Sequence, residues 1–145
     1  MENVHATCVD INGAGVLITG DSGVGKSDLA LRLIENKGAV LVSDDRTDLK
    51  EENGHLTALP PKTIEGLLEV RGVGIAKKKF KPKTYIKLVV EAALKEKIER
   101  YPSAQFFENQ GVLIPKILLS LTEASAPDKV VVKLKCVLEE EKQNT

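Results

Sequence analysis

Short apolar runs separated by turn residues dominate the chain, a pattern that predicts more strand than helix. Residues 4–11 form a β-rich run, and the turn pair Asn12-Gly13 joins it to a compact apolar run over 15–19. This order predicts a hairpin. Residues 27–34 show helical spacing, and we expect that helix to end near Lys37, just before a glycine.

The remaining chain continues in the same way. Asn53-Gly54 predicts a second hairpin turn, and residues 76–84, rich in lysine, are typical of a solvated loop. Residues 130–138 fit either a last strand or a helix, and both interpretations stay open. Further strands are expected over 39–43, 55–58, 67–75, 85–91 and 112–119, the last with Pro115 at an edge or a bulge.

The order strand, helix, strand over residues 15–43 predicts a βαβ unit. A length of 145 residues suits one domain with a real core. We therefore expect a single α/β domain over residues 1–145, with the last few residues as a disordered tail.

The segment between the second strand and the first helix fills every fixed position of the P-loop pattern. Glycines let successive backbone N–H groups turn toward one point, and the helix N-terminus adds partial positive charge there. Lys26 then reaches the β- and γ-phosphates of a nucleoside triphosphate, and the Ser27 hydroxyl ligates Mg²⁺. The predicted nucleotide-binding residues are Gly20, Asp21, Ser22, Gly23, Val24, Gly25, Lys26 and Ser27.

The strand over 39–43 ends in the acidic pair Asp44-Asp45. This is the Walker-B arrangement, which places carboxylates beside the metal ion of a P-loop. An ordinary turn is the alternative, since Asp is common at strand ends. Because the strand follows the P-loop helix directly, we favour the site interpretation.

Three other residues carry weaker signals. His5 stands near the start of the first strand, where a lone histidine is more often structural than catalytic. Glu69 and Arg71 lie in a Glu-x-Arg-Gly-x-Gly sequence at the end of the strand over 67–75. That carboxylate and guanidinium could serve a metal and a phosphate, or they could form a solvated pair.

Composition and charge limit the classes of partner that the chain is expected to bind. Basic and acidic residues both number 21, aromatic residues make up 3%, and Trp is absent. No global field favours nucleic acid or an anionic membrane, and base-stacking side chains are scarce, so we expect neither partner. No apolar run approaches membrane-spanning length, and the N-terminus lacks a signal-peptide pattern, so a cytoplasmic location is expected. Cys8 and Cys136 are expected to be buried free thiols.

Three sequence motifs together resemble a known family. Val-Asp-Ile-Asn-Gly-Ala-Gly-Val-Leu-Ile-Thr-Gly-Asp-Ser-Gly-Val-Gly-Lys-Ser, then Leu-Val-Ser-Asp-Asp, then Glu-Val-Arg-Gly-Val-Gly-Ile resemble the catalytic domain of bacterial HPr kinase/phosphorylase. The resemblance implies a P-loop α/β core with a mixed sheet and flanking helices, like that of phosphoenolpyruvate carboxykinase. It also implies a hexamer that uses ATP and Mg²⁺ to phosphorylate a serine of the phosphocarrier protein HPr, thereby regulating the phosphotransferase system. Many members also remove that phosphate with inorganic phosphate.

The resemblance assigns roles position by position. Asp44 matches the base toward the substrate serine, which is also the acid in the reverse reaction, and Arg100 stands where a further catalytic arginine is expected. The implied catalytic residues are His5, Lys26, Asp44, Arg71 and Arg100, and the implied magnesium ligands are Ser27, Glu69 and Asp45.

The chain also departs from the family pattern. Typical members carry an additional N-terminal domain, so the chain resembles a short form. The loop associated with dephosphorylation usually reads Pro-Gly-Arg, but the corresponding residues 124–129 differ, which weakens the phosphorylase assignment more than the kinase assignment. Two other functions stay open: a P-loop kinase of a small metabolite, and an ATP-sensing module without catalysis. The retained Asp44, Glu69 and Lys26 argue against a sensor, which needs no base.

Overall fold

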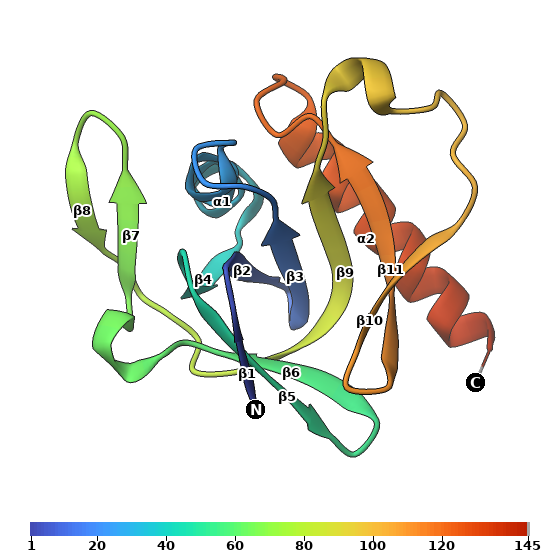
Figure 1. The fold of residues 1–145 in the computed structure, drawn as a ribbon, viewed down its shortest axis with the longest axis horizontal. Helices are drawn as coiled ribbons and strands as arrows, with labels where there is room; N and C mark the ends of the chain where they lie inside the picture. Colours follow the sequence, from blue (N-terminus) through green and yellow to red (C-terminus); the bar gives the residue numbers. More distant parts are fainter. Residues whose placement is uncertain (145) are drawn as a thin grey trace.

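The chain folds into a curled mixed sheet with two α-helices over one of its faces (Figure 1). This computed structural model describes residues 1–144. The strands are β1 (Glu2–Val4), β2 (Ala6–Ile11), β3 (Ala14–Thr19), β4 (Val40–Ser43), β5 (Thr47–Glu52), β6 (His55–Leu59), β7 (Leu67–Val70), β8 (Gly74–Lys77), β9 (Thr84–Ala92), β10 (Gln105–Asn109) and β11 (Val112–Leu119). The helices are α1 (Lys26–Lys37) and α2 (Ala126–Gln143), with short 3₁₀ turns η1 (Lys62–Ile64) and η2 (Lys95–Lys97).

Strand β9 is the centre of the sheet. It pairs in parallel with β3 and with β11, and its first residues pair antiparallel with β6. Strand β2 pairs antiparallel with both β3 and β4, so β3 and β4 run parallel with β2 between them. The predicted βαβ unit is therefore confirmed, with one antiparallel strand inserted. The start of β2 consequently lies beside the end of β4.

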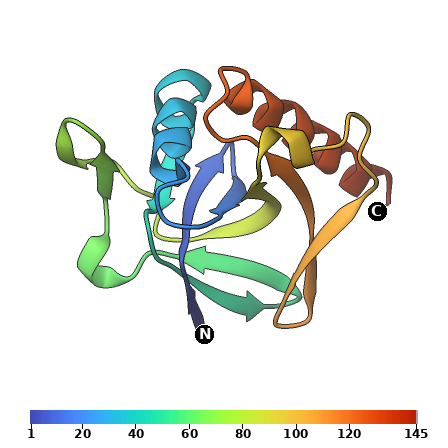
Figure 2. The same cartoon turned by 45° about the horizontal axis from the view of Figure 1, so that its top comes forward.

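The central strands are apolar on both faces because both faces are covered. Val16 and Ile18 pack into a core shared with the helices, whereas Leu17 packs into a second core on the opposite face. Figure 2 shows α1 and α2 over one face of the sheet and the β5–β6 hairpin below the other. Strands buried on both faces read as continuous hydrophobic runs, which explains the compact apolar pattern of residues 15–19.

Most of the predicted elements are confirmed. Residues 130–138 belong to helix α2, which buries Val130, Leu134 and Val137 at helical spacing. Pro115 lies in the part of β11 that pairs only with β10, so the strand is locally an edge there. The predicted tail includes Thr145, which lies outside the described residues, while α2 extends to Gln143.

Two expectations were wrong, and one strand was not predicted. The single strand over 67–75 is two strands, β7 and β8, which form a hairpin outside the main sheet. Residues 105–109 form β10, which the sequence pattern did not predict. Cys8 is buried as expected, and burial raises the pKa of its thiol, with Asp10 adding to the effect. Cys136, by contrast, is exposed on α2, because it lies on the outer face of that helix.

The loop predicted over 76–84 is shorter, because Ala76 and Lys77 belong to β8 and Thr84 begins β9. Its lysines are also not merely solvated. Lys78 pairs with Glu35, and Lys83 pairs with Glu52. Over residues 1–144, no helix has the length and apolar character needed to cross a membrane.

The buried carboxylate of Asp10 ties the first hairpin to the start of β9. It accepts hydrogen bonds from the Gly13 amide at 2.8 Å, the Thr84 hydroxyl at 2.6 Å and the Lys81 ammonium at 3.0 Å. Burial by itself would raise the pKa of Asp10, but these hydrogen bonds and the Lys81 charge outweigh it, so the pKa is lowered below its ordinary value of 3.8.

We predict that Asp10→Asn lowers the free energy of unfolding by about 1–3 kcal/mol, because it removes the charged acceptor of the buried Thr84 hydroxyl, the Gly13 amide and the Lys81 ammonium. Since the folded pKa is below the unfolded one, the wild-type advantage is complete at neutral pH and shrinks as the pH falls below 3.8. Urea titrations at several pH values measure it. Glu35→Gln, which removes one exposed partner, should cost at most about 1 kcal/mol. An equal loss in the two variants would contradict the prediction.

Candidate active site

The P-loop joins β3 to α1 in the conformation that the sequence pattern requires. Gly20, Gly23 and Gly25 all have positive φ angles, of 149°, 83° and 103°. Gly25 is the N-cap of α1 and supplies no side-chain hydrogen bond, so the first N–H groups of the helix are left for another acceptor. An anion is the natural partner of such a helix N-terminus.

Lys26 is folded over the P-loop. Its Nζ donates to the carbonyl oxygens of Gly20 at 2.7 Å and Asp21 at 2.8 Å. Burial lowers the pKa of Lys26, and the nearby charges of Asp45, Asp21 and Asp44 oppose that shift. A phosphate oxygen is a stronger acceptor than a carbonyl for an ammonium group. Lys26 is thus positioned to exchange these carbonyls for a phosphate.

Asp44 follows β4 directly and is almost fully buried. Its Oδ1 accepts hydrogen bonds from the Ser27 hydroxyl at 2.6 Å and the Thr7 hydroxyl at 3.0 Å. Its Oδ2 accepts one from the Glu69 amide at 3.0 Å. The carboxylate therefore links the P-loop helix, strand β2 and the β7–β8 hairpin at one point.

Asp45 turns away from its neighbour. Its φ angle of 69° is in the left-handed region, which Asp tolerates better than most residues. The reversal exposes Asp45, and its Oδ1 lies 2.9 Å from His5 Nε2. The two acidic residues thus have different partners, with Asp44 held by hydroxyls and an amide and Asp45 by an imidazole.

The β7–β8 hairpin brings Glu69 and Arg71 to the P-loop. Gly72, with a φ angle of 80°, lets the chain reverse directly after Arg71. A Cβ atom at Gly23 would lie 4.0 Å from Arg71 Nη2, so the guanidinium is beside the loop. The sequence Glu-x-Arg-Gly-x-Gly is therefore the turn of a hairpin rather than the end of one strand.

These residues surround one cleft of about 710 Å³. It joins the P-loop, the end of β4 and the β7–β8 hairpin, so three segments distant in sequence meet there. Of the residues predicted for catalysis and metal binding, the cleft is lined by His5, Lys26, Ser27, Asp44, Asp45, Glu69 and Arg71.

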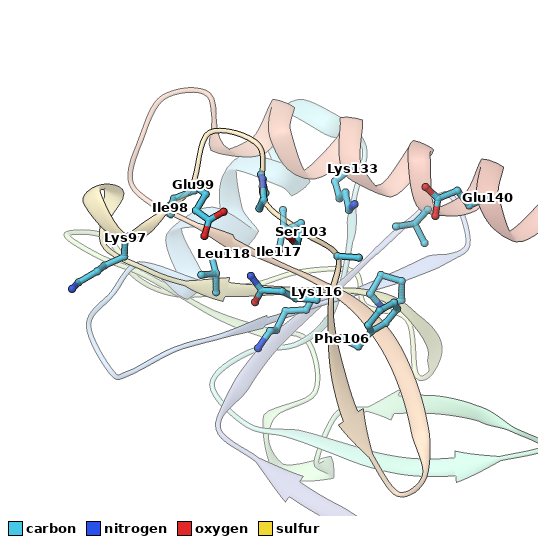
Figure 3. Close-up of a pocket in the computed structure, with 15 residues that line it drawn as sticks. Lys97, Ile98, Glu99, Ser103, Phe106, Lys116, Ile117, Leu118, Lys133 and Glu140 are labelled. Atoms are coloured by element: carbon cyan, nitrogen blue, oxygen red, sulfur yellow. The ribbon is translucent and has the colours of Figure 1, made fainter.

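Arg100 is not among the residues that line this cleft. It is exposed on the segment after η2, with its guanidinium 5.9 Å from the ring centre of Tyr101. A separate cavity of about 350 Å³ lies beside that segment, between α2 and the β10–β11 hairpin, and Lys97, Glu99 and Lys133 are on its walls (Figure 3). The catalytic role of Arg100 stays a prediction.

The residues predicted to hold Mg²⁺ offer oxygen donors, a hydroxyl from Ser27 and carboxylates from Glu69 and Asp45. Mg²⁺ prefers such hard donors and keeps several water or phosphate ligands, so it needs few protein groups. Within residues 1–144, no cluster of three His, Cys, Asp or Glu side chains is suited to a metal. The donor set therefore fits an ion bound together with a phosphate better than a metal held by protein groups alone.

Among the residues of the cleft that sequence reasoning missed are two threonines, Thr7 and Thr122. Thr7 is fully buried on β2, two positions after His5, which lies in the bend between β1 and β2. On the continuous strand predicted over 4–11, residues two apart share a face. Thr122 comes from the loop after β11, and its Cγ2 lies 3.3 Å from where a Cβ at Gly25 would be. Arg32 of α1 holds that loop through the carbonyls of Leu121 and Glu123. Only the spacing of Thr7 after His5 gave a signal in the sequence.

The strand, glycine loop and helix, with a lysine and a buried acidic strand end, define a P-loop domain. The family model described as HPr Serine kinase C-terminal domain matches residues 1–135. The chain belongs to this family.

Individual relatives agree with the family assignment. The chain is 50% identical over 72 residues to an HPr kinase/phosphorylase of Clostridium botulinum and 51% identical over 72 residues to one of Clostridium beijerinckii. Each aligned segment is 50% of this chain but only 23% and 24% of the relatives, so the match spans about a quarter of their length. The solved structure of the HPr(Ser) kinase/phosphatase from Coxiella burnetii is similar, with a TM-score of 0.86 and 28% identity over 99% of this chain and 96% of that one.

We predict that Gly20→Ala destabilises the domain by about 1–3 kcal/mol, because its Cβ would lie 2.7 Å from Ala92 Cβ. Thermal unfolding measures the loss. Gly54→Ala is the control, since Gly54 also has a positive φ angle but has no atom within 4 Å of the added carbon. A larger loss in Gly54→Ala than in Gly20→Ala would show that close contact at the P-loop is not the cause.

Proposed function

We propose that the chain is the catalytic part of an HPr serine kinase, which transfers the γ-phosphoryl group of ATP to a serine hydroxyl of HPr. The observation that carries the proposal is the buried carboxylate of Asp44, whose Oδ1 lies 2.6 Å from the hydroxyl of P-loop Ser27. A base next to the phosphate-binding loop is what transfer to a hydroxyl needs, and a module that only senses ATP does not need it.

The P-loop and its neighbours would hold the triphosphate. The open N–H groups at the start of α1 and the Lys26 ammonium would bind phosphate oxygens. Arg71, beside Gly23, adds a second cation to the loop. Fixed cations aimed at developing charge are the main source of rate enhancement in phosphoryl transfer.

Ser27 would hold Mg²⁺, with Glu69 and Asp45 completing the protein donors. When bound, the ion neutralises charge on the transferring phosphoryl group. Asp45 is exposed, and its contact with His5 can orient its carboxylate. The donor types support Mg²⁺ over a softer metal.

Asp44 is able to act as the base. A carboxylate offers about four lone-pair positions, and three hydrogen bonds use three of them, which leaves room for one proton. Asp44 would take the proton of the serine hydroxyl as the serine oxygen bonds to the γ-phosphorus. The bond from that phosphorus to the β,γ-bridging oxygen breaks, and ADP leaves.

HPr is proposed as the acceptor because of the family and the names of the relatives. Those names also include phosphorylase and phosphatase. In the reverse reaction an oxygen of inorganic phosphate would attack the phosphoserine phosphorus, pyrophosphate would form, and Asp44 would return the proton to the serine oxygen. Residues 126–129, part of the segment expected to support this reaction, form the first turn of α2.

The hexamer implied by the resemblance belongs to the same proposal. Apolar side chains on the paired strands β10 and β11 support association with further copies, since Phe106 and Leu113 are 55% and 64% exposed. Sedimentation of the purified chain measures the assembly.

The direct test is transfer of labelled phosphate from ATP and Mg²⁺ to purified HPr. HPr with its acceptor serine changed to alanine is the matched control. The proposal expects label on the first protein and none on the second. Binding of ATP without transfer to HPr would instead support a metabolite kinase or an ATP sensor. Inorganic phosphate added to phosphorylated HPr then tests the reverse reaction.

We predict that Asp44→Asn lowers kcat for transfer about 10²–10⁴-fold, because the amide cannot accept the serine proton, while ATP binding is retained. Single-turnover transfer and calorimetric ATP binding measure the two effects. Asp48→Asn is the control, since Asp48 is bonded to Asn3 outside the cleft and should leave transfer unchanged. Full transfer by Asp44→Asn would remove Asp44 from the role of base.

A further inference from the structure

Thr7 is in contact with both acidic residues of the cleft. Its Oγ1 lies 3.0 Å from Asp44 Oδ1 and 3.3 Å from the backbone nitrogen of Asp45. A hydroxyl has one proton to donate and two lone pairs to accept. Because the Asp45 amide can only donate, the Thr7 proton is left for Asp44. The two contacts therefore fix the direction of the hydroxyl.

The fold places Thr7 there for a simple reason. β2 is antiparallel to β4, so the first residues of β2 lie beside the residues that follow β4. His5 and Thr7 are two positions apart, and His5 contacts Asp45 while Thr7 contacts Asp44. The start of β2 and the bend just before it thus contact both members of the acidic pair.

The second hydroxyl that donates to Asp44 is that of Ser27. Ser27 belongs to the P-loop and is the residue proposed to hold Mg²⁺, so its bond to Asp44 competes with that role. Thr7 is 0% exposed, and no such competition affects it. Among the side chains of residues 1–144 that donate to Asp44, Thr7 is the one without a proposed ligand of its own.

We propose that Thr7 is a positioning residue, whose hydroxyl holds the Asp44 carboxylate in the orientation needed to accept the proton of the acceptor hydroxyl. The inference rests on the proposed function, since it assigns Thr7 a role through Asp44. Thr7 is fully buried, so it acts on the carboxylate and not on a bound molecule. Groups that orient a reacting residue typically affect rate about 10–100-fold when lost.

The test compares Thr7→Val with Thr7→Ser. Valine has nearly the shape of threonine but lacks the hydroxyl, whereas serine keeps it. Thr7→Val should lower kcat for transfer to HPr about 10–100-fold with KM for ATP within about twofold, and Thr7→Ser should recover most of the loss. An unchanged kcat in Thr7→Val, or an equal loss in Thr7→Ser, would overturn the proposal.

Thr47→Val is the matched control for the loss of a buried hydroxyl. Thr47 is also 0% exposed, and its hydroxyl donates to the Ala6 carbonyl at 2.9 Å, outside the cleft. Its loss should lower the melting temperature about as much as Thr7→Val does but leave kcat unchanged. A loss of kcat in Thr47→Val that equals the loss in Thr7→Val would show that general destabilisation is responsible.

Crystal structures of the wild type, Thr7→Val and Thr7→Ser separate this inference from the proposed function. The positioning role requires the Asp44 carboxylate to rotate or occupy several conformers in Thr7→Val and to keep its place in Thr7→Ser. An unmoved carboxylate in Thr7→Val would overturn the inference even if transfer to HPr is observed. A rotated carboxylate would support it even if the acceptor is a different molecule.

Discussion

The buried carboxylate of Asp44 is the point on which the candidate site depends. Three hydrogen bonds join it to β2, to the first turn of α1 and to the β7–β8 hairpin. An unpaired carboxylate at this depth would be costly, so the bonds and the burial require one another. The same contacts that satisfy Asp44 also place the hairpin, with Glu69 and Arg71, beside the P-loop.

Two polar side chains of the P-loop, those of Lys26 and Ser27, are paired with groups of the site itself. Lys26 binds two carbonyls of its own loop, and Asp44 binds the Ser27 hydroxyl. A nucleotide bound with Mg²⁺ would have to replace the Lys26 bonds with bonds to phosphate, which are stronger because both partners are charged, and the Ser27 bond with a bond to the metal ion. The site therefore combines a rigid support in the sheet with polar groups whose present partners are exchangeable.

Local patterns in the sequence predicted the local structure well. The turn pair Asn12-Gly13 and the P-loop carry their own conformational signals, so the first hairpin, α1 and the conformation of the P-loop were predictable. The acidic pair after β4 was recognised from its place at the end of the strand that follows the P-loop helix. The residues that each aspartate of the pair contacts could not be predicted in this way. That Asp44 and Asp45 face different ways follows from a single left-handed residue, which a sequence does not display.

Features that depend on contacts between residues far apart in the chain could not be predicted from the sequence. Strand β10 depends on pairing with β11, and the Gln110-Gly111 turn between them resembles the two turns that were predicted, but Gln is a weak signal at that position. The approach of Thr122 to the P-loop depends on how Arg32 holds the loop before α2. The side of α2 that carries Cys136 depends on which face of that helix meets the sheet.

The most direct test of the central claim is a crystal structure of the chain with Mg²⁺ and a non-hydrolysable ATP analogue. The account predicts that the triphosphate lies on the P-loop, that Lys26 leaves the Gly20 and Asp21 carbonyls for a phosphate oxygen, and that Asp44 faces the terminal phosphoryl group. A nucleotide bound elsewhere, or a terminal phosphate turned away from Asp44, would contradict the claim that this carboxylate serves phosphoryl transfer.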